Sequence, residues 1–345
     1  MTDPAASPTT EPAPVARPQR RFAAAVRIGV LLAVLVAGLA FFTDLRDVGS
    51  ALAGFDWRLT PVILLLVLWN YAWRFAKWDR YLDALDTPGM PRATNMLIYL
   101  SAFAMALTPA KVGELVKALH VRRATGVPVA RTGAIVAAER ITDGLAMVVL
   151  AVTGLVQFSY GRPLVGLFAA FSLVLVVMLR KPQLIDRAID RFASHDRFAG
   201  TVRHARGFLD ASSALYSARL LAMGVGYGVL GWFGECAALF IVLRGLGVDG
   251  GFDLLLIATF TMAVASLAGA ASMIPGGLGV ADASVAAVLL LLVDDPSMNR
   301  TVAAAATLLV RFATLWFAVI LGVIASLALE RRMARSALIT DAPAT

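Results

Sequence analysis

The sequence is poor in charged residues, cysteine and histidine. Only 16% of its 345 residues are charged, whereas a soluble domain carries about 25%. Cys236 is the single cysteine, which excludes an intramolecular disulfide and a metal site built on several thiolates. The three histidines, His120, His195 and His204, are scattered and predict no metal site. We therefore expect neither a metal ion nor another cofactor.

Common enzyme signatures are missing as well. The run Gly276-Gly277-Leu278-Gly279 lacks the lysine and the strand context of a nucleotide-binding phosphate loop. A Gly-x-Ser-x-Gly nucleophile elbow is also absent. The sequence therefore favours a protein that is not an enzyme.

Long apolar runs are what the sequence has in abundance. Hydrophobic residues make up 59% of the chain, and the mean hydropathy is +0.77. Runs of this length are typical of membrane-spanning helices. We predict an all-α polytopic membrane protein with about six full spans: Val26–Phe42, Leu59–Lys77, Gly133–Phe158, Pro163–Leu179, Arg219–Leu243 and Thr301–Leu329.

Outside these spans the chain divides simply. Residues 1–24 are rich in proline and alanine and predict a disordered cytoplasmic N-terminus. Residues 25–329 form the membrane domain, and residues 330–345 a cytoplasmic tail. Within the domain, residues 183–216 predict a cytoplasmic amphipathic helix, which either lies on the membrane surface or packs on the protein's own loops. One membrane domain accounts for the whole chain.

Two further segments are broken rather than continuous. Met96–Leu107 has only 12 residues, and as a helix it would rise about 18 Å against a hydrocarbon core of about 30 Å. Leu254–Ile274 is followed by proline and glycines and then by a short apolar arm, Val280–Val293. Such breaks are tolerated at membrane depth where they line protein or water. We predict two broken or re-entrant hairpins, with these helix-break residues: Pro109, Gly113, Pro275, Gly276, Gly277 and Gly279.

The two breaks share a pattern. Each reads Pro-x-x-(Val/Leu)-Gly with a carboxylate just after it, and a span with an arginine follows. Matching elements that enter from opposite sides are typical of an inverted repeat, whose binding site lies near the bilayer midplane. Chance is the alternative, because proline and glycine breaks are common in membrane helices. We predict an inverted repeat.

The net charge of +8 fits this topology. With a cytoplasmic N-terminus, the basic residues concentrate on the cytoplasmic side, and we count Lys77 among them. The outer loops hold Arg46, Arg58, Arg162, Arg244 and Arg300. A positive inner side is the expected bias. We predict a multi-pass plasma (inner) membrane protein with both termini in the cytoplasm, in contact with anionic lipid headgroups and not with nucleic acid.

Several charged residues fall inside the predicted intramembrane elements, where each costs at least about 2.5–3.5 kcal/mol. Arginine suits phosphate because its planar fork binds two oxygens. We predict headgroup-phosphate binding by four residues: Lys111, Lys117, Arg140 and Arg311. We predict charge-partner or coupling roles for four more: Glu114, Asp143, Asp282 and Glu235. Arg140 with Asp143, and Glu114 with Lys117, are spaced to pair on a helix. Structural ion pairs between helices are the alternative.

Three motifs in order carry a family resemblance. They are Thr108-Pro109-Ala110-Lys111-Val112-Gly113-Glu114, then Glu139-Arg140 with Asp143, then Pro275-Gly276-Gly277-Leu278-Gly279 with Asp282. Together they resemble the transmembrane region of the flippase-like lysylphosphatidylglycerol synthase family. Two departures are Ala110, where the family usually has glycine, and Ala281-Asp282, where a basic residue and glutamate are typical.

The resemblance implies translocation of lipids or handling of lipid-linked intermediates of envelope biogenesis. The full-length synthases add a soluble aminoacyl-transfer domain, and residues 330–345 offer no room for one, so lysyl transfer is not expected. We predict a transporter of an anionic phospholipid or a polyprenyl-phosphate-linked lipid. Two alternatives stay open: an intramembrane enzyme that acts on a lipid phosphate through Glu114 or Asp282, and an ion-coupled exporter of a small polar solute.

Overall fold

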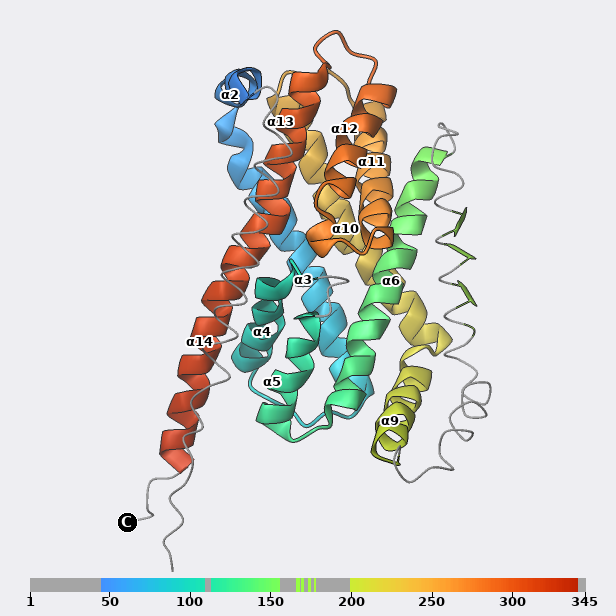
Figure 1. Cartoon of the computed structure of the whole chain (residues 1–345), viewed down its shortest axis with the longest axis vertical. Coiled ribbons are helices and arrows are strands. Elements are labelled where there is room, and N and C mark those ends of the chain that lie inside the picture. Colours follow the sequence, from blue (N-terminus) through green and yellow to red (C-terminus); the bar gives the residue numbers. More distant parts are fainter. Residues whose placement is uncertain are drawn as a thin grey trace, which may run out of the picture.

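The computed structural model describes residues 45–108, 113–155 and 199–340, together with isolated positions between 166 and 177. Every element assigned there is a helix, which confirms the all-α membrane fold (Figure 1). Between residues 45 and 155 the elements are α2 (Leu45–Ala53), η1 (Trp57–Leu59), α3 (Thr60–Ala84), α4 (Arg92–Ser101), η2 (Ala102–Met105), α5 (Val116–Thr125) and α6 (Val129–Leu155). The later elements are α9 (Ala199–Leu215), α10 (Ala218–Gly245), α11 (Phe252–Ala271), η5 (Pro275–Gly277), α12 (Val280–Leu292), α13 (Arg300–Arg311), η6 (Phe312–Trp316) and α14 (Phe317–Thr340).

The helix ends follow local chemistry. Proline occupies the first turn of α3, where its missing N–H costs no hydrogen bond. Helix α5 ends at Gly126, whose positive φ of 79° is the left-handed cap that glycine adopts most easily. Asn299 caps α13 because its side chain accepts a hydrogen bond from the N–H of Val302. These signals set where the membrane helices begin and end.

Five helical segments in the described part of the chain are long and apolar enough to cross a bilayer: Trp57–Ala84, Ala218–Gly245, Phe252–Ala271, Pro275–Leu292 and Arg300–Met333. Three of them coincide with predicted spans, and α6 covers most of a fourth, Gly133–Phe158. Val26–Phe42 and most of Pro163–Leu179 lie outside the described residues. The number of spans therefore stays a prediction.

Two helical hairpins approach the middle of the molecule from opposite ends. Helices α4 and α5, with η2 between them, occupy the lower half of Figure 1, and α11 and α12, joined through η5, occupy the upper half. Their tips touch, because a Cβ placed on Gly276 would lie 2.9 Å from a side-chain carbon of Leu107. Pro109 and Lys111 lie outside the described residues. The inverted repeat itself stays a prediction.

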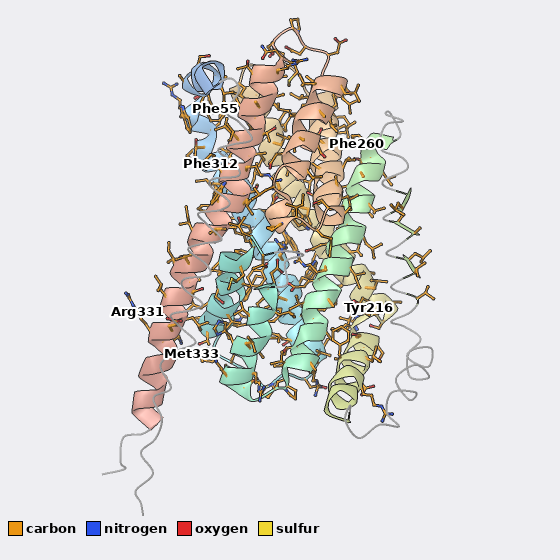
Figure 2. The ribbon with its side chains drawn as sticks, viewed as in Figure 1. Phe55, Tyr216, Phe260, Phe312, Arg331 and Met333 are labelled. Carbon is orange, nitrogen blue, oxygen red and sulfur yellow. The ribbon has the colours of Figure 1, made fainter. Side chains whose placement is uncertain are left out.

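A long helix runs along one side of both hairpins. It consists of α13, η6 and α14 in series (Figure 1). Its outward face is apolar, as the exposed ring of Phe312 shows, whereas Arg331 marks a charged lower end (Figure 2). An apolar outward face and charged ends are what a bilayer requires of a spanning helix. The helix continues to Thr340, so the expected tail is helical over most of its length.

Helices α3 and α10 approach each other closely on glycine. A Cβ on Gly234 would lie 2.5 Å from the carbonyl oxygen of Leu66, and one on Gly231 would lie 3.3 Å from that of Asn70. Small residues let membrane helices pack backbone to backbone. The approach brings Arg74 of α3 beside Trp232 of α10.

Helix α9 belongs to the segment predicted to be amphipathic. It packs against α6 and α3, and Leu209, Ala211 and Leu215 are buried. Residues 199–215 therefore pack on helices of the protein, and the placement of the whole segment on the membrane surface or on loops stays a prediction. Residues 183–198 lie outside the described residues.

Candidate functional site

A cavity of about 400 Å³ lies where the two hairpin tips meet. Its walls come from α3, η2, α6, α10, α11, η5 and α12, and from the stretch Val310–Ala318 of the long helix. Much of the lining is apolar, and six ionisable residues interrupt it: Arg74, Glu114, Arg140, Asp143, Glu235 and Arg311. A concave apolar site with a few converging charges is the usual form of a ligand site.

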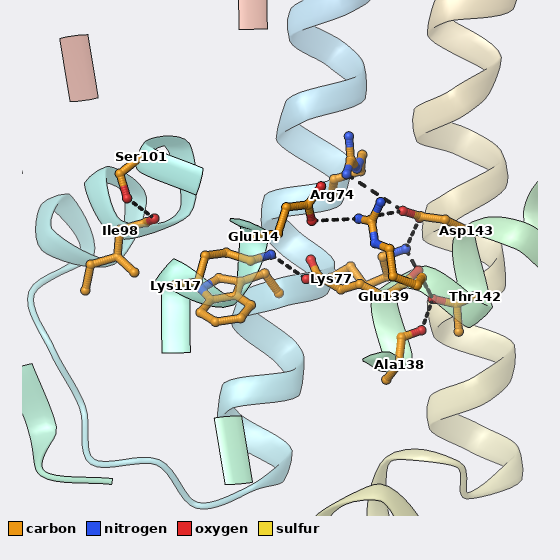
Figure 3. A network of polar contacts seen from close by, with 12 residues as sticks. Arg74, Lys77, Ile98, Ser101, Glu114, Lys117, Ala138, Glu139, Thr142 and Asp143 are labelled. Carbon is orange, nitrogen blue, oxygen red and sulfur yellow. Dashed lines mark hydrogen bonds and ion pairs between the residues drawn. The ribbon is translucent and has the colours of Figure 1, made fainter. Parts of the chain in front are cut away.

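Arg140 stands on α6 at the cavity wall. Its Nη2 lies 3.1 Å from Glu114 Oε2, on the first hairpin, and 3.2 Å from Asp143 Oδ2, one helical turn further on (Figure 3). The side chain of Arg140 keeps 28% of its surface exposed, whereas both carboxylates are almost fully buried. The carboxylates therefore hold the guanidinium from behind and leave part of it open to the cavity.

Asp143 connects Arg140 to two cations of α3. Its Oδ1 lies 2.5 Å from Lys77 Nζ, and its Oδ2 lies 3.8 Å from Arg74 Nη2 (Figure 3). Lys77 is completely buried and also reaches the hydroxyl of Thr142 at 3.3 Å. The guanidinium of Arg74 lies over the rings of Phe103 and Trp232, a placement that offsets part of its desolvation. A single carboxylate thus compensates three buried cations.

A second ion pair lies behind this group. Lys117 Nζ is 2.5 Å from Glu139 Oε2 (Figure 3). The lysine also lies over the rings of Trp78 and Tyr99. Neither Lys117 nor Glu139 lines the cavity. The pair ties α5 to α6, and a buried charge needs such a partner.

Arg311 occupies the other side of the cavity, at the end of α13. Its Nε donates to Asp282 Oδ1 on α12, and its Nη1 points to the carbonyl oxygen of Gly276 at 3.5 Å. The other carboxylate oxygen of Asp282 accepts from the N–H of Gly279 at 2.8 Å. Asp282 therefore caps α12 and positions Arg311 at the same time.

Several guanidinium donors in the cavity wall have no acceptor among the described residues. These buried nitrogens are Nε of Arg74, Nε and Nη2 of Arg140, and Nη2 of Arg311. Although Nη2 of Arg140 lies within ion-pair distance of two carboxylates, it makes no hydrogen bond with them. These nitrogens are shielded inside the wall, so what the cavity offers a ligand is the exposed part of each side chain, 28% for Arg140 and 20% for Arg311.

The structure places the predicted site residues differently with respect to the cavity. Arg140, Arg311, Glu114, Asp143 and Glu235 line the cavity, whereas Asp282 stands behind Arg311. Lys117, predicted to bind the headgroup, instead neutralises Glu139 away from the cavity. The predicted pair of Glu114 with Lys117 is replaced by two pairs across to α6, because both side chains face that helix. Lys111 lies outside the described residues.

The helix-break residues act at the hairpin tips. Gly276 and Gly277 line the cavity, with positive φ angles of 64° and 65°, and Gly279 has φ of 80°. These left-handed conformations favour glycine. Gly113 leaves no room for a Cβ, which would lie 2.5 Å from Met105 Cβ, and its N–H donates to Thr108 Oγ1.

Sequence reasoning missed Arg74, Lys77 and Tyr71. Lys77 was counted as a cytoplasmic charge, and this was wrong, because it is buried at Asp143. A signal was present in α3: Asn70, Arg74, Lys77 and Tyr81 recur at the spacing of one helical face. All four are buried. A polar face inside an apolar run would have predicted an internal site.

Comparison with known proteins agrees with this architecture. Residues 26–322 match the family model for the lysylphosphatidylglycerol synthase TM region. The chain belongs to this family. A member of the lysylphosphatidylglycerol synthase TM family is a membrane protein, and the apolar helices make this chain a multi-pass one. A curated relative from Methanothermobacter thermautotrophicus, described as a UPF0104 membrane protein, is 23% identical over 297 residues, which cover 79% of this chain and 83% of the relative.

In the part of the chain that the structure describes, no group of three or more histidine, cysteine, aspartate or glutamate side chains could hold a metal ion. The cavity wall of this lysylphosphatidylglycerol synthase TM family member presents guanidinium and carboxylate groups beside apolar residues.

Proposed function

We propose that this protein carries a lipid with an anionic phosphate headgroup across the membrane. The observation that carries the proposal is that Arg140 and Arg311 line one cavity from opposite walls, each with part of its side chain exposed. A phosphate offers acceptor oxygens that match the planar fork of arginine. An anionic phospholipid and a polyprenyl-phosphate-linked lipid share this chemistry.

The lining supports a lipid substrate. The lining combines the charged groups with apolar residues such as Met147, Met262 and Val285. A headgroup and the start of its apolar chain need neighbouring surfaces of these two kinds. Burying charged groups in a membrane protein is costly, and such groups usually mark the pathway of a transported substrate.

The carboxylates set the affinity that such a site can have. Glu114 and Asp143 hold Arg140, and Asp282 holds Arg311. Because these pairs already neutralise most of the positive charge, the headgroup competes with fixed carboxylates for the two guanidinium groups. A carrier needs such moderate binding, since a headgroup that bound without competition would not be released on the far side.

A leaflet assay tests the proposal. Purified protein is reconstituted with fluorescent phosphatidylglycerol, and the fraction of the probe accessible to an impermeant quencher is followed over time. We expect Arg140→Ala and Arg311→Ala each to lower the rate to that of protein-free liposomes. Arg244→Ala is the matched control, because Arg244 pairs with the exposed Asp249 away from the cavity. Wild-type rates in both cavity variants would refute the proposal. Mass spectrometry of the probe shows whether it has been chemically altered, the outcome expected of an enzyme.

We also propose that the lower end in Figure 1 faces the cytoplasm in the plasma membrane. Exposed Arg122 and Arg123 lie at that end of α5, and exposed Arg331 and Arg332 lie toward the lower end of the long helix, whereas Asp294 and Arg300 are exposed around the loop between α12 and α13, at the upper end. This asymmetry has the sign of the positive-inside bias. Cys236 is buried, so cysteines placed at Arg123 and Asp294 can be probed in whole cells with an impermeant maleimide. We expect only Asp294→Cys to react; labelling of Arg123→Cys alone would reverse the orientation.

A further inference from the structure

The long helix changes its geometry beside the cavity. Directly after Arg311, residues Phe312–Trp316 form a π-helical turn, η6, between α13 and α14. Single π-turns inside α-helices are rare, and they are found mostly at functional positions. Thr314 and Leu315 of this turn line the cavity together with Arg311. The irregular turn is therefore part of the cavity wall.

The two halves of the helix contact different hairpins. Before the turn, α13 packs against α12 of the second hairpin; after it, α14 packs against α4 and η2 of the first. The second contact is close, since a Cβ on Gly322 would lie 2.1 Å from the backbone nitrogen of Ala104. The π-turn is thus the connection between the part of the helix that holds one hairpin and the part that holds the other.

One side chain stabilises the turn from outside the helix. The hydroxyl of Tyr71, on α3, donates a buried hydrogen bond of 2.9 Å to the carbonyl oxygen of Thr314. The ring of Tyr71 contacts Phe103 of the first hairpin and is stacked near Phe317, with centroids 4.8 and 6.4 Å away. The Thr314 carbonyl also accepts from the backbone N–H of Phe317, so Tyr71 is a second donor, which comes from another helix. Its single hydroxyl links α3 to the point where the helix changes register.

We propose that η6 is the joint on which the two hairpins move and that the Tyr71 hydroxyl latches this joint in the observed state. A π-turn accommodates one residue more than an α-turn, and one residue of an α-helix corresponds to about 100° of rotation. Loss of the π-turn therefore rotates α13 against α14 and carries the Arg311 guanidinium away from Asp282 and Gly276. Tyr71 is a positioning residue that acts through the turn. That the movement serves lipid transport rests on the proposed function.

Distance measurements between the hairpins test the joint without measuring transport. Spin labels at Leu119→Cys on α5 and Leu291→Cys on α12 use two exposed positions, one on each hairpin. A Cys236→Ala background removes the native thiol. We expect Tyr71→Phe to shift the ratio of two distance populations about fivefold, the effect of one buried hydrogen bond. A distribution that superposes on the wild-type one overturns the proposal.

Tyr99→Phe is the matched control. Tyr99 is also buried and packs on Phe103, with ring centroids 5.3 Å apart, and its hydroxyl has no hydrogen-bond partner among the described residues. We expect Tyr99→Phe to leave the distances unchanged. An equal shift in Tyr99→Phe and Tyr71→Phe would assign the effect to general loosening and overturn the latch.

Deletion of Ala313 provides a second, independent variant. It removes the extra residue of the π-turn, so we expect a continuous α-helix that keeps the observed rotation of α13 against α14, and a distance distribution that contains the observed population alone. A wild-type distribution in a folded deletion variant would overturn the joint. If the deletion variant does not fold, Tyr71→Phe still decides the question. Normal transport by Arg140→Ala and Arg311→Ala would refute the proposed function but leave the distance result intact, so the two failures are distinguishable.

Discussion

The two hairpins are fastened to the rest of the protein in different ways. The first is tied to α6 by two ion pairs, the fully buried Lys117 with Glu139 and the partly exposed Glu114 with Arg140. The second has one ion pair at its tip among the described residues, Asp282 with Arg311, and otherwise packs through α11 on α6 and α10 and through α12 on α13. The first attachment is strong only while every charge keeps its partner, because an unpaired buried charge is costly.

The difference teaches which wall of the cavity is fixed and which can move. Two ion pairs, one of them fully buried, set the first hairpin in one position on α6. Helix packing without ion pairs imposes no such directional constraint on the second hairpin, and its charged contact goes to the residue that precedes the π-turn. We therefore expect substitutions in the first attachment to affect stability most, and those in the second to affect transport at a smaller cost in stability.

The largest expected effect is at Lys117 and Glu139. Glu139→Leu leaves the Lys117 ammonium buried without its partner, which costs about 3–5 kcal/mol. We expect a large fall in the apparent melting temperature in detergent, measured by the fluorescence of the buried tryptophans. The double variant Lys117→Met with Glu139→Leu should recover most of the loss, since an apolar pair needs no compensation. If the double variant is as unstable as the single one, the ion pair is not what fastens this hairpin.

The next effect is expected at Gly113, near the tip of the first hairpin. A Cβ there would lie 2.5 Å from Met105 Cβ and 2.7 Å from Thr108 Oγ1, so Gly113→Ala overpacks the tip and costs about 1–3 kcal/mol. Thermal unfolding of the purified variant measures this. Gly133→Ala on α6 is the control, because its Cβ would meet only a Leu115 carbon at 3.8 Å. Equal melting temperatures for the two variants would show that the tip accommodates the added methyl group without a loss of stability.

A smaller effect on stability is expected at Asp282. The ion pair with Arg311 is partly exposed, so we expect Asp282→Asn to cost about 1 kcal/mol. Transport should fall much more than stability, because the neutral amide no longer holds the guanidinium. The leaflet assay and a melting curve on the same preparation compare the two. Full transport in Asp282→Asn would mean that Arg311 needs no carboxylate to stay in place.

The smallest effect is expected at the surface. Arg244 and Asp249 form an ion pair at 2.9 Å, but the side chain of Asp249 is 90% exposed. Asp249→Asn should leave both the melting temperature and the transport rate unchanged, because solvent screens such a pair. A clear loss of stability would mean that the exposed fraction of an ion pair does not predict how much that pair contributes to the stability of this protein.

The breaks at 108–114 and 275–279 were predictable because proline and glycine act locally, on the backbone of a few residues. The helical fold, the cavity-lining Arg140 and Arg311, and the spacing of Arg140 with Asp143 were also within reach of the sequence. The partners of Lys117 and Glu114 were not, since each finds its carboxylate or guanidinium on α6. Such pairs depend on how the helices are rotated against each other, which local patterns leave open.

The roles of Lys77 and Tyr71 could not be predicted from local sequence patterns either. Lys77 follows an apolar run and has the pattern of a charge at a helix end, yet tight packing of α10 on α3 encloses it. Tyr71 is one aromatic residue among many, and its bond to Thr314 joins residues 243 positions apart. No short-range signal distinguishes either residue.

The sequence by itself determined that this chain is helical, that it crosses a membrane, and where its helices break. Hydrophobic run length and backbone preferences are properties of neighbouring residues, so they can be read along the chain. Only the tertiary structure decided which charges face the cavity, which are neutralised behind it, and that the long helix changes register beside Arg311. These outcomes depend on the rotation and close approach of helices that are distant in the sequence.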